Sequence, residues 1–483
     1  MEKKQALNPY MASWEYVPDA EPHIVDGRVY VYGSHDLFNG LNFCLGDYVC
    51  WSAPVDDLGN WTCHGVIFRR DQDPAAPRIR LTNGLAAPDM VQGPDGRYYL
   101  YYFMGGTAMI SVAVCDEPAG RYEFYGYVKY ADGTPIGKKK EPFQFDPGIF
   151  RDDDGRLYLY TGFALQGNPI LLNGLEPTKH GPMCYELDTK DMLTVLTGPN
   201  YIGVEGENAD SSSYKGHAFL EASSMRKFNG TYYFIYSSLN SHELCYATSD
   251  RPDGGFEFGG VLVSDGDIGM PGVTDVKHAR MDTGNTHGSL IEINGKYYIF
   301  YHRHTNRKQS SRQGCAEEIR FENGRFYQAE MTSCGLNGGP LRGKGSYPAY
   351  AACNVYGKNG TRFLSMIKYL KGNSPYLTQD GGDREEGPDQ YIANMCDGAV
   401  AGFKYFDLTK TSKIRIHVRS RAQGTVLVKN EVNGEPVARI AIRPTGGQEK
   451  GFSAPIASGT AKSALYFTFE GKGHFDFMSF DLK

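Results

Sequence analysis

Long apolar runs, paired cysteines and an excess of basic residues are all missing from this chain of 483 residues. No segment approaches the roughly 18 consecutive apolar residues that a membrane-spanning helix needs, so we expect no membrane partner. The formal net charge of −6 argues against nucleic acid as a partner. The ten cysteines occur singly, without a Cys-x-x-Cys pair, which argues against a zinc site and a dense disulfide framework.

An apolar signal core is also missing from residues 1–9. We therefore expect a cytoplasmic protein with reduced, mostly buried thiols, or a secreted protein whose signal peptide is absent from this sequence. Nothing in the sequence indicates the oligomeric state.

Aromatic residues and glycine are abundant, with 34 Tyr, 26 Phe and 59 Gly. Aromatic side chains are enriched in strands, and glycine is enriched in turns, so this composition favours many short strands. The length exceeds that of one typical hydrophobic core, which indicates two or three domains.

A short motif occurs five times in the first 300 residues: Asp-Gly or Asn-Gly, followed by an aromatic segment. These dipeptides between two alternating apolar segments are a strong hairpin signal, because both residues accept positive φ. We expect each copy to open with a β-hairpin. The five turn glycines are Gly27, Gly96, Gly155, Gly230 and Gly295.

A second repeat has the same spacing. Residues 116–126 resemble residues 250–260, and the interval between them equals the interval between Gly96 and Gly230. Repeats of several strands, with almost no helical periodicity, predict the blades of a β-propeller with inserted loops. We predict an all-β fold with a five-bladed β-propeller over residues 1–340. The alternative is two stacked β-sandwiches whose hairpins are similar by accident.

The pattern changes after the glycine-rich segment 330–346, which is typical of a domain junction. Alternating apolar segments at 414–419, 425–429 and 464–469 are bounded by turn residues. This pattern predicts a β-sandwich of the jelly-roll type over residues 341–483.

One polar residue lies seven to nine positions before each turn glycine. The innermost strand of a propeller blade runs along the central channel, so residues entering these strands crowd around the axis at one end. Carboxyl groups gathered in this way raise one another's pKa, and such clusters serve acid–base chemistry or cation binding. The five residues are Asp19, Asp89, Asp146, Glu221 and His287.

Each of these residues also has a structural alternative. A single Asp before a strand is commonly a turn or capping residue. Asp89 could be a scaffold partner, and His287 could be a hydrogen-bonded channel residue. Asp146 and Glu221 stand among apolar or small neighbours, and burial in such surroundings raises the pKa of a carboxyl group.

The set of motifs resembles glycoside hydrolase family 43, whose members are five-bladed propellers that hydrolyse arabinose- and xylose-containing glycans with inversion. The matching segments are 18–22, 32–36, 87–90, 145–155, 220–225, 287–289 and 301–303. The resemblance implies that Asp19 is the general base and Glu221 the general acid. It implies that Asp146 orients the acid and keeps the pKa of the acid high.

The resemblance also implies residues around the substrate. His287 matches a channel histidine that faces a hydrated calcium ion in many members, and no organic cofactor is expected. Arg303 matches an arginine near the substrate. We expect four more residues to bind substrate, each with a purely structural alternative: Trp14, His35, Asp36 and Asp89.

The implied activity is removal of terminal sugars from plant-type carbohydrates, with α-L-arabinofuranosyl units as the first choice. β-Xylosidase and galactofuranosidase are the alternatives. Residues 222–225 and Gly148 differ from the sequence that is usual in the family, which leaves the identity of the sugar open. A non-catalytic sugar-binding propeller is the competing class of protein. Such a protein would have lost the acid or the base, whereas all three candidate carboxylates are present in this sequence.

The C-terminal segment resembles carbohydrate-binding modules of family 6 at residues 395–407 and 471–481. Such modules bind sugars on exposed aromatic side chains. Residues 341–483 contain no Trp. A structural sandwich packed against the propeller is therefore an equal alternative.

Overall fold

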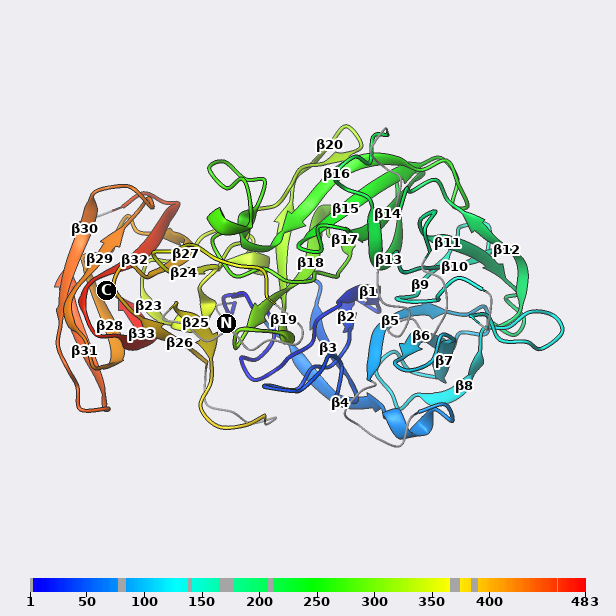
Figure 1. Cartoon of the computed structure of the whole chain (residues 1–483), viewed down its shortest axis with the longest axis horizontal. Coiled ribbons are helices and arrows are strands. Elements are labelled where there is room, and N and C mark those ends of the chain that lie inside the picture. Colours follow the sequence, from blue (N-terminus) through cyan, green and yellow to red (C-terminus); the bar gives the residue numbers. More distant parts are fainter. Residues whose placement is uncertain are drawn as a thin grey trace.

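The computed structural model of the chain describes residues 3–76, 84–137, 141–164, 178–206, 212–364, 374–383, 390–457 and 459–483. In this part of the chain the helical elements are single 3-10 turns, and no helix is long and apolar enough to cross a membrane. Figure 1 shows a ring of sheets formed by the first two thirds of the sequence and a second body formed by the last third.

The ring contains five sheets within the described residues. The first blade contains β1 (Glu21–Val25), β2 (Arg28–Tyr32), β3 (Tyr48–Pro54) and β4 (Thr62–Phe68). The second contains β5 (Leu85–Gln92), β6 (Tyr98–Met104), β7 (Ile110–Cys115) and β8 (Glu123–Tyr127). The third contains β9 (Gly148–Arg151), β10 (Leu157–Thr161), β11 (Met183–Leu187) and β12 (Val195–Tyr201). The fourth contains β13 (Phe219–Phe228), β14 (Thr231–Ser238), β15 (Glu243–Ser249) and β16 (Glu257–Ser264), and the fifth contains β17 (Leu290–Ile293), β18 (Lys296–Thr305) and β19 (Lys308–Ile319).

The first strand of every blade lies at the centre of the ring (Figure 1). Contacts join β1 to β5, β5 to β9, and β9 to β13, and β17 contacts β1. A parallel bridge between Ala20 and Gly288 joins the first blade to the last. The residues that enter these inner strands therefore lie around one axis, as predicted.

The five predicted hairpins are present, in two forms. In blades one, four and five, two residues with positive φ join the strands, as at Asn229 (52°) and Gly230 (82°). In blades two and three the loops are longer, and only the glycines, Gly96 and Gly155, have positive φ. The Asp-Gly dipeptide therefore occurs in two turn geometries, the two-residue turn of blade one and the longer loops of blades two and three.

Buried tyrosines hold neighbouring blades together. The hydroxyl of Tyr32 in blade one donates to the carbonyl of Pro118 in blade two at 2.5 Å. The hydroxyl of Tyr160 in blade three donates to the carbonyl of Pro252 in blade four at 2.9 Å. The two prolines occupy the same position in the second sequence repeat, which explains that repeat. A buried ring with a satisfied hydroxyl provides apolar area at no cost in unpaired polar groups.

The last third of the chain forms two facing sheets, a β-sandwich. One sheet contains β22 (Leu341–Arg342), β24 (Asn354–Tyr356), β27 (Val400–Asp407), β29 (Gln423–Lys429), β30 (Pro436–Ile442) and β32 (Ser463–Lys472). The other contains β23 (Gly345–Pro348), β25 (Tyr376–Thr378), β26 (Tyr391–Met395), β28 (Lys413–Ser420), β31 (Glu449–Pro455) and β33 (Phe475–Leu482). A small hairpin of β20 (Phe321–Glu322) and β21 (Arg325–Phe326) precedes them. The 3-10 turns are η1 (Arg70–Gln72), η3 (Asp265–Asp267), η4 (Val276–His278), η5 (Gly335–Asn337) and η6 (Ala349–Ala351).

One hydrophobic core continues from the propeller into the sandwich. It contains Ile299 and Tyr301 of blade five together with Phe403 and Phe406 of β27. Division of the chain at residue 340 into separately folding units stays a prediction, since this core is shared.

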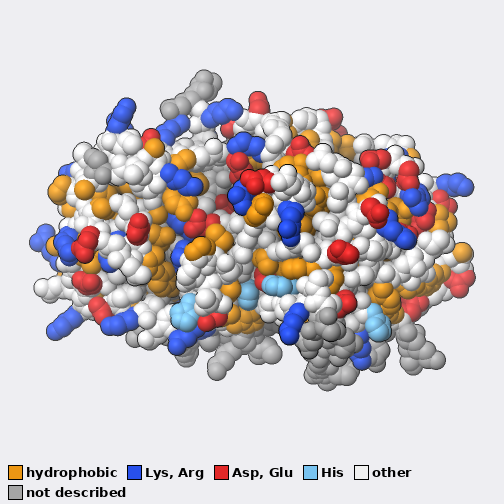
Figure 2. Space-filling view, turned by 90° about the horizontal axis from the view of Figure 1, so that it is seen from above, with side chains coloured by type: hydrophobic (Ala, Val, Ile, Leu, Met, Phe, Trp, Pro, Cys, Tyr) orange, Lys and Arg blue, Asp and Glu red, His pale blue; other side chains and the backbone are white. Residues whose placement is uncertain are grey.

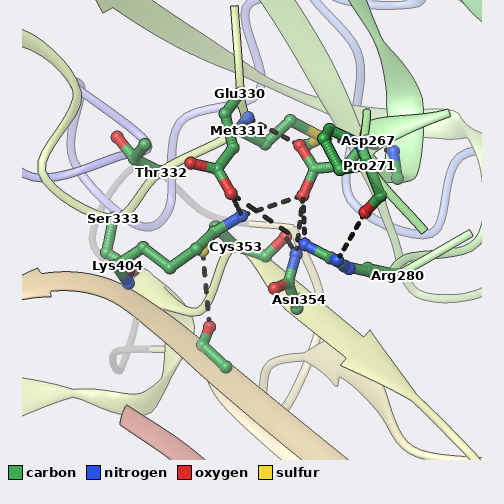
Figure 3. Close-up of polar contacts among 12 residues, drawn as sticks. Asp267, Pro271, Arg280, Glu330, Met331, Thr332, Ser333, Cys353, Asn354 and Lys404 are labelled. Atoms are coloured by element: carbon green, nitrogen blue, oxygen red, sulfur yellow. Dashed lines mark hydrogen bonds and ion pairs between the residues drawn. The ribbon is translucent and has the colours of Figure 1, made fainter. Parts of the chain in front are cut away.

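A buried ion network lies at the same junction (Figure 3). Lys404 of β27 is fully buried, and its Nζ lies 2.8 Å from Asp267 Oδ2 and 2.9 Å from Glu330 Oε1. Arg280 Nη1 lies 3.9 Å from both carboxylates. The backbone N–H of Met331 donates to Asp267 Oδ1 at 2.7 Å. Lys404 of the sandwich therefore neutralises charge at an anionic site next to the propeller.

Replacing Lys404 by Met is expected to lower the free energy of unfolding by about 3–5 kcal/mol, because Asp267 then keeps a buried charge without its nearest cation. Urea unfolding followed by circular dichroism measures this change. The matched control is Lys296→Met, which breaks an exposed pair with Glu318 and should cost at most about 1 kcal/mol. Equal losses in the two variants would contradict the role given to Lys404.

Candidate active site

Four inner strands have a residue in the left-handed region, either just before the strand or, in β5 and β13, at an irregularity of the pairing near its beginning. The φ values are 57° at Asp19, 42° at Ala87, 45° at Asp146 and 69° at Ala222. This conformation costs a non-glycine residue roughly 1–2 kcal/mol, and such strain is concentrated at functional sites. Two of the predicted carboxylates, those of Asp19 and Asp146, occupy this position themselves, and Glu221 directly precedes it.

Asp89 does not occupy the equivalent position, which in blade two belongs to Ala87. Asp89 is fully buried, its Oδ1 lies 2.7 Å from His23 Nε2, and its Oδ2 accepts from the N–H of Ile149 at 2.8 Å. These contacts connect blades one, two and three. The structure therefore favours the scaffold alternative over substrate binding, because both oxygens already have partners.

Asp19 lies beside an arginine that the sequence reasoning missed. Arg312 Nη1 donates to Asp19 Oδ1 at 2.8 Å, and both side chains are almost completely buried. His302 Nδ1 lies 3.4 Å from the same oxygen. The guanidinium stabilises negative charge on this carboxylate in a site with little access to water.

Asp36 holds Arg312 in place. Its Oδ2 accepts from Arg312 Nε at 2.8 Å, and its Oδ1 accepts from Arg312 Nη2 at 3.0 Å. The N–H of Cys44 donates to Oδ1 at 2.8 Å, and Asp36 is fully buried. The expectation that Asp36 binds substrate is not supported, since its carboxylate is used to orient the arginine.

Asp146 contacts the backbone next to Glu221 and lies close to His287. Its Oδ2 accepts from the N–H of Ala222 at 3.2 Å and lies 3.6 Å from His287 Nδ1. Burial, followed by the charges of Glu221 and Asp19, raises the pKa of Asp146 well above its ordinary value. Asp146 therefore holds the strand entrance next to Glu221 and favours a protonated state.

Glu221 is half-buried at the start of β13. Burial, and after it the charge of Asp19, raises the pKa of Glu221 from 4.5 to about 7. The charge that raises the pKa of Glu221 is thus that of Asp19, and the charge of Arg312 lowers it. The charge of Glu221 in turn raises the pKa of Asp146. Asp146 and Glu221 both favour the protonated form, and negative charge is stabilised at Asp19 by Arg312.

His287 faces this group of carboxyl groups from blade five. Its Nδ1 lies 3.6 Å from Asp146 Oδ2 and 3.9 Å from Asp19 Oδ1, and burial lowers its pKa. Calcium takes six to eight oxygen ligands. In the described part of the chain, the groups of side chains able to hold a metal are His217, Glu243 and Cys245, and Glu21, His23 and Asp89. The residues around His287 do not form an oxygen cage, so no step below uses an ion.

Arg303 points away from these carboxyl groups. Its Nη1 donates to the carbonyls of Tyr350 at 2.7 Å and Ala352 at 3.0 Å, and its Nη2 donates to Gln313 Oε1 at 3.0 Å. Successive residues of a strand lie on opposite faces, so Arg303 and His302 cannot share a face. The expectation for Arg303 is therefore corrected: the arginine at the carboxylates is Arg312.

The register of the last hairpin explains this assignment. Arg312 lies opposite His304, which shares the face of His302, whereas Gln313 lies opposite Arg303. The turn at residues 306–307 would by itself place Arg312 opposite Tyr301, on the other face, but the pairing shifts by three residues between Thr305↔Lys308 and His304↔Arg312. The sequence alone indicates neither that turn, which lacks the Asn-Gly or Asp-Gly dipeptide of the other hairpins, nor the shift in pairing after it.

His35 and Trp14 lie near the base but have structural contacts. His35 Nδ1 lies 2.8 Å from the carbonyl of Asp47, and its Nε2 lies 3.1 Å from Glu15 Oε1. Trp14 is half-buried, and its ring centroid lies 5.8 Å from that of Trp51. Packing against the first blade is the role that these contacts support.

The sandwich has its own cavity, of about 230 Å³, beside Asp380, Tyr391, Arg419 and Asp476. The guanidinium of Arg419 lies 4.4 Å from the centroid of the Tyr391 ring and therefore covers one face of it. Tyr391 is also buried. The described residues that line this cavity provide no free aromatic platform, and sugar binding by the sandwich stays a prediction.

The chain is similar to known proteins in three kinds of comparison. Residues 17–326 match the family model of glycosyl hydrolases family 43. The chain is 48% identical over 483 residues to a xylosidase/arabinosidase of Thermoclostridium stercorarium, with 99% of each chain covered. A xylosidase/arabinosidase of Bacteroides ovatus is 30% identical over 317 residues, which are 61% of this chain and 87% of the relative.

A solved structure covers both parts of the chain. It is the crystal structure of a family 43 arabinoxylan arabinofuranohydrolase from Bacillus subtilis in complex with cellotetraose. The alignment covers 99% of this chain and 97% of that one, with a TM-score of 0.51 and 19% identity. At this identity the likeness shows the fold, and the predicted five-bladed propeller followed by a β-sandwich is confirmed.

Proposed function

The chain belongs to glycosyl hydrolase family 43 and is an O-glycosyl hydrolase, and from its site we propose that it removes terminal α-L-arabinofuranosyl units with inversion. One observation carries the inverting mechanism in this proposal. Asp19 is paired with Arg312, whereas the pKa of Glu221 is raised to about 7. An inverting glycosidase needs this combination, one ionised and one protonated carboxyl group.

The reaction is a single displacement at the anomeric carbon. Asp19 accepts a proton from a water molecule as the water oxygen bonds to that carbon. Glu221 donates its proton to the glycosidic oxygen as the bond between that oxygen and the sugar breaks. The two carboxyl groups of such enzymes lie about 6.5–9.5 Å apart, which leaves room for the water.

Asp146 positions Glu221, and Arg312 positions Asp19. Asp146 accepts the N–H of Ala222, the residue after the acid, and thereby fixes the strand entrance that carries Glu221. Arg312 binds Asp19 and keeps its carboxylate oriented between blades one and five. Asp146 acts by positioning, and Arg312 acts by positioning and by its charge, which is effective in a site that excludes water.

β-Xylosidase activity is the second candidate. The relative that shares 48% identity over the whole chain is described as a xylosidase/arabinosidase, so either sugar, or both, fits the comparison. Galactofuranoside hydrolysis is the third candidate. Action on xylan- or arabinoxylan-derived oligosaccharides is compatible with the descriptions of the two xylosidase/arabinosidase relatives.

Two further expectations belong to this proposal. A hydrated calcium ion facing His287 stays a prediction, and calcium titration of the chelator-treated enzyme tests it. Location in the cytoplasm, or outside the cell after removal of a signal peptide, also stays a prediction.

A substrate screen tests the proposal directly. With 4-nitrophenyl α-L-arabinofuranoside, β-D-xylopyranoside and β-D-galactofuranoside, we expect the highest kcat/KM for the arabinofuranoside, followed by the xyloside. Release of 4-nitrophenol is the measurement, and Asp19→Asn protein is the blank. Absence of turnover on all three substrates and on arabinoxylan oligosaccharides would refute the proposed function.

The pH profile tests the acid. Since the pKa of Glu221 is raised to about 7, its acid form predominates below pH 7, and kcat/KM should fall as the pH rises through 7. In Glu221→Gln this alkaline limb should vanish. Activity on an alkyl or sugar leaving group should fall at least about 100-fold, the effect of losing a general acid.

Activated substrates provide the control for that variant. A 2,4-dinitrophenyl leaving group needs no proton, so Glu221→Gln should retain most of its rate on such a substrate, whereas Asp19→Asn should lose it. The matched variant Glu292→Gln changes an exposed glutamate of β17 and should behave as the wild type. An alkaline limb that persists in Glu221→Gln would assign the acid to another residue.

A further inference from the structure

The segment just before Asp19 is held by side chains of the sandwich. The hydroxyl of Tyr16 donates to Gln379 Oε1 at 2.7 Å and accepts from Gln390 Nε2 at 2.5 Å. Gln379 follows β25 and Gln390 precedes β26, so both belong to one edge of the sandwich. All three side chains are buried, with 1% of Tyr16, 5% of Gln379 and 1% of Gln390 exposed.

Tyr16 is connected to the base through a short chain of hydrogen bonds. The carbonyl of Tyr16 accepts from the N–H of Asp36 at 2.9 Å. The carboxylate of Asp36 binds Arg312, and Arg312 donates to Asp19. A displacement of Tyr16 therefore moves Asp36, the residue that orients the guanidinium on the base.

A second connection reaches the same segment. Arg303 donates to the carbonyls of Tyr350 and Ala352, next to η6, and also to Gln313. Gln313 Nε2 in turn donates to the carbonyl of Ser13 at 2.8 Å. The segment 13–16 is thus held by the sandwich edge on one side and by the junction on the other.

The ion network of Figure 3 keeps the sandwich in this position. Lys404 extends from β27 to Asp267 and Glu330, and the shared core surrounds it. Figure 1 shows the sandwich beside blade five and close to the start of the chain. Gln379 and Gln390 therefore approach Tyr16 from a body that is fixed to the propeller.

We propose that the C-terminal sandwich is a positioning element of the active site, which holds the general base through the contacts of Gln379 and Gln390 with Tyr16. This inference rests on the proposed function in one respect, that Asp19 is the base. It gives the sandwich a role in catalysis that does not require it to bind sugar.

The variant Tyr16→Phe in the full chain tests the proposal, since it removes the hydroxyl and keeps the ring. We expect kcat to fall about tenfold, within the range known for displaced catalytic groups. KM should stay within twofold of wild type, and the alkaline limb near pH 7 should persist because Glu221 is unchanged.

The matched control is Tyr246→Phe. Tyr246 is also buried, and its hydroxyl also makes two hydrogen bonds, to the carbonyl and the N–H of Phe326. Thermal unfolding of both variants shows whether they fold and lose similar stability. A comparable loss of stability with a loss of kcat only in Tyr16→Phe supports positioning.

Hydrogen–deuterium exchange provides a readout that needs no activity. Peptides covering residues 13–19 and 34–37 should exchange faster in Tyr16→Phe than in wild type or in Tyr246→Phe. Unchanged exchange in these peptides, or a kcat within twofold of wild type, would overturn the proposal. A wild type inactive on every substrate would refute the proposed function, while the exchange result would still decide whether the sandwich holds the segment.

Discussion

The pairing of Arg312 with Asp19 is the interaction on which the rest of the site depends. It stabilises charge on one carboxylate within a group of buried carboxyl groups, and that charge adds to burial in raising the pKa of Glu221 to about 7. Burial favours the neutral form of a carboxyl group, whereas a guanidinium at hydrogen-bond distance favours the charged form. The arginine therefore separates the roles of base and acid, and Asp36 fixes it with two hydrogen bonds.

The fold serves this arrangement in two ways. Inner strands that meet at the axis bring Asp19, Asp146 and Glu221 together from three blades, with strained backbone at each entrance. Such strain persists because the surrounding packing fixes it. The sandwich adds contacts to the segment before Asp19, and the buried Lys404 network keeps those contacts in place.

Much of the fold and half of the site could be predicted from the sequence. Asn-Gly and Asp-Gly turns gave the hairpins, because those dipeptides determine local geometry. Asp146 and Glu221 could be found since they precede these turns at a nearly constant spacing. Arg303 was assigned incorrectly, and two roles stayed open for Asp89, for a physical reason: which face a strand residue occupies depends on pairing register and loop length, and a shift of one residue reverses it. The contacts of Arg312 with Asp19 and of Gln390 with Tyr16 join segments that are far apart in the sequence, so no local sequence pattern predicts them.

The central claim is that Asp19 activates a water molecule, which attacks the anomeric carbon in a single displacement. Its most direct test is to determine the anomeric configuration of the first sugar released. Proton NMR during early hydrolysis of an aryl glycoside distinguishes the two anomers before they equilibrate. The account predicts that the product first appears with the configuration opposite to that of the substrate. First appearance of the same configuration would require a covalent intermediate on a carboxylate and would contradict the roles given to Asp19 and Glu221.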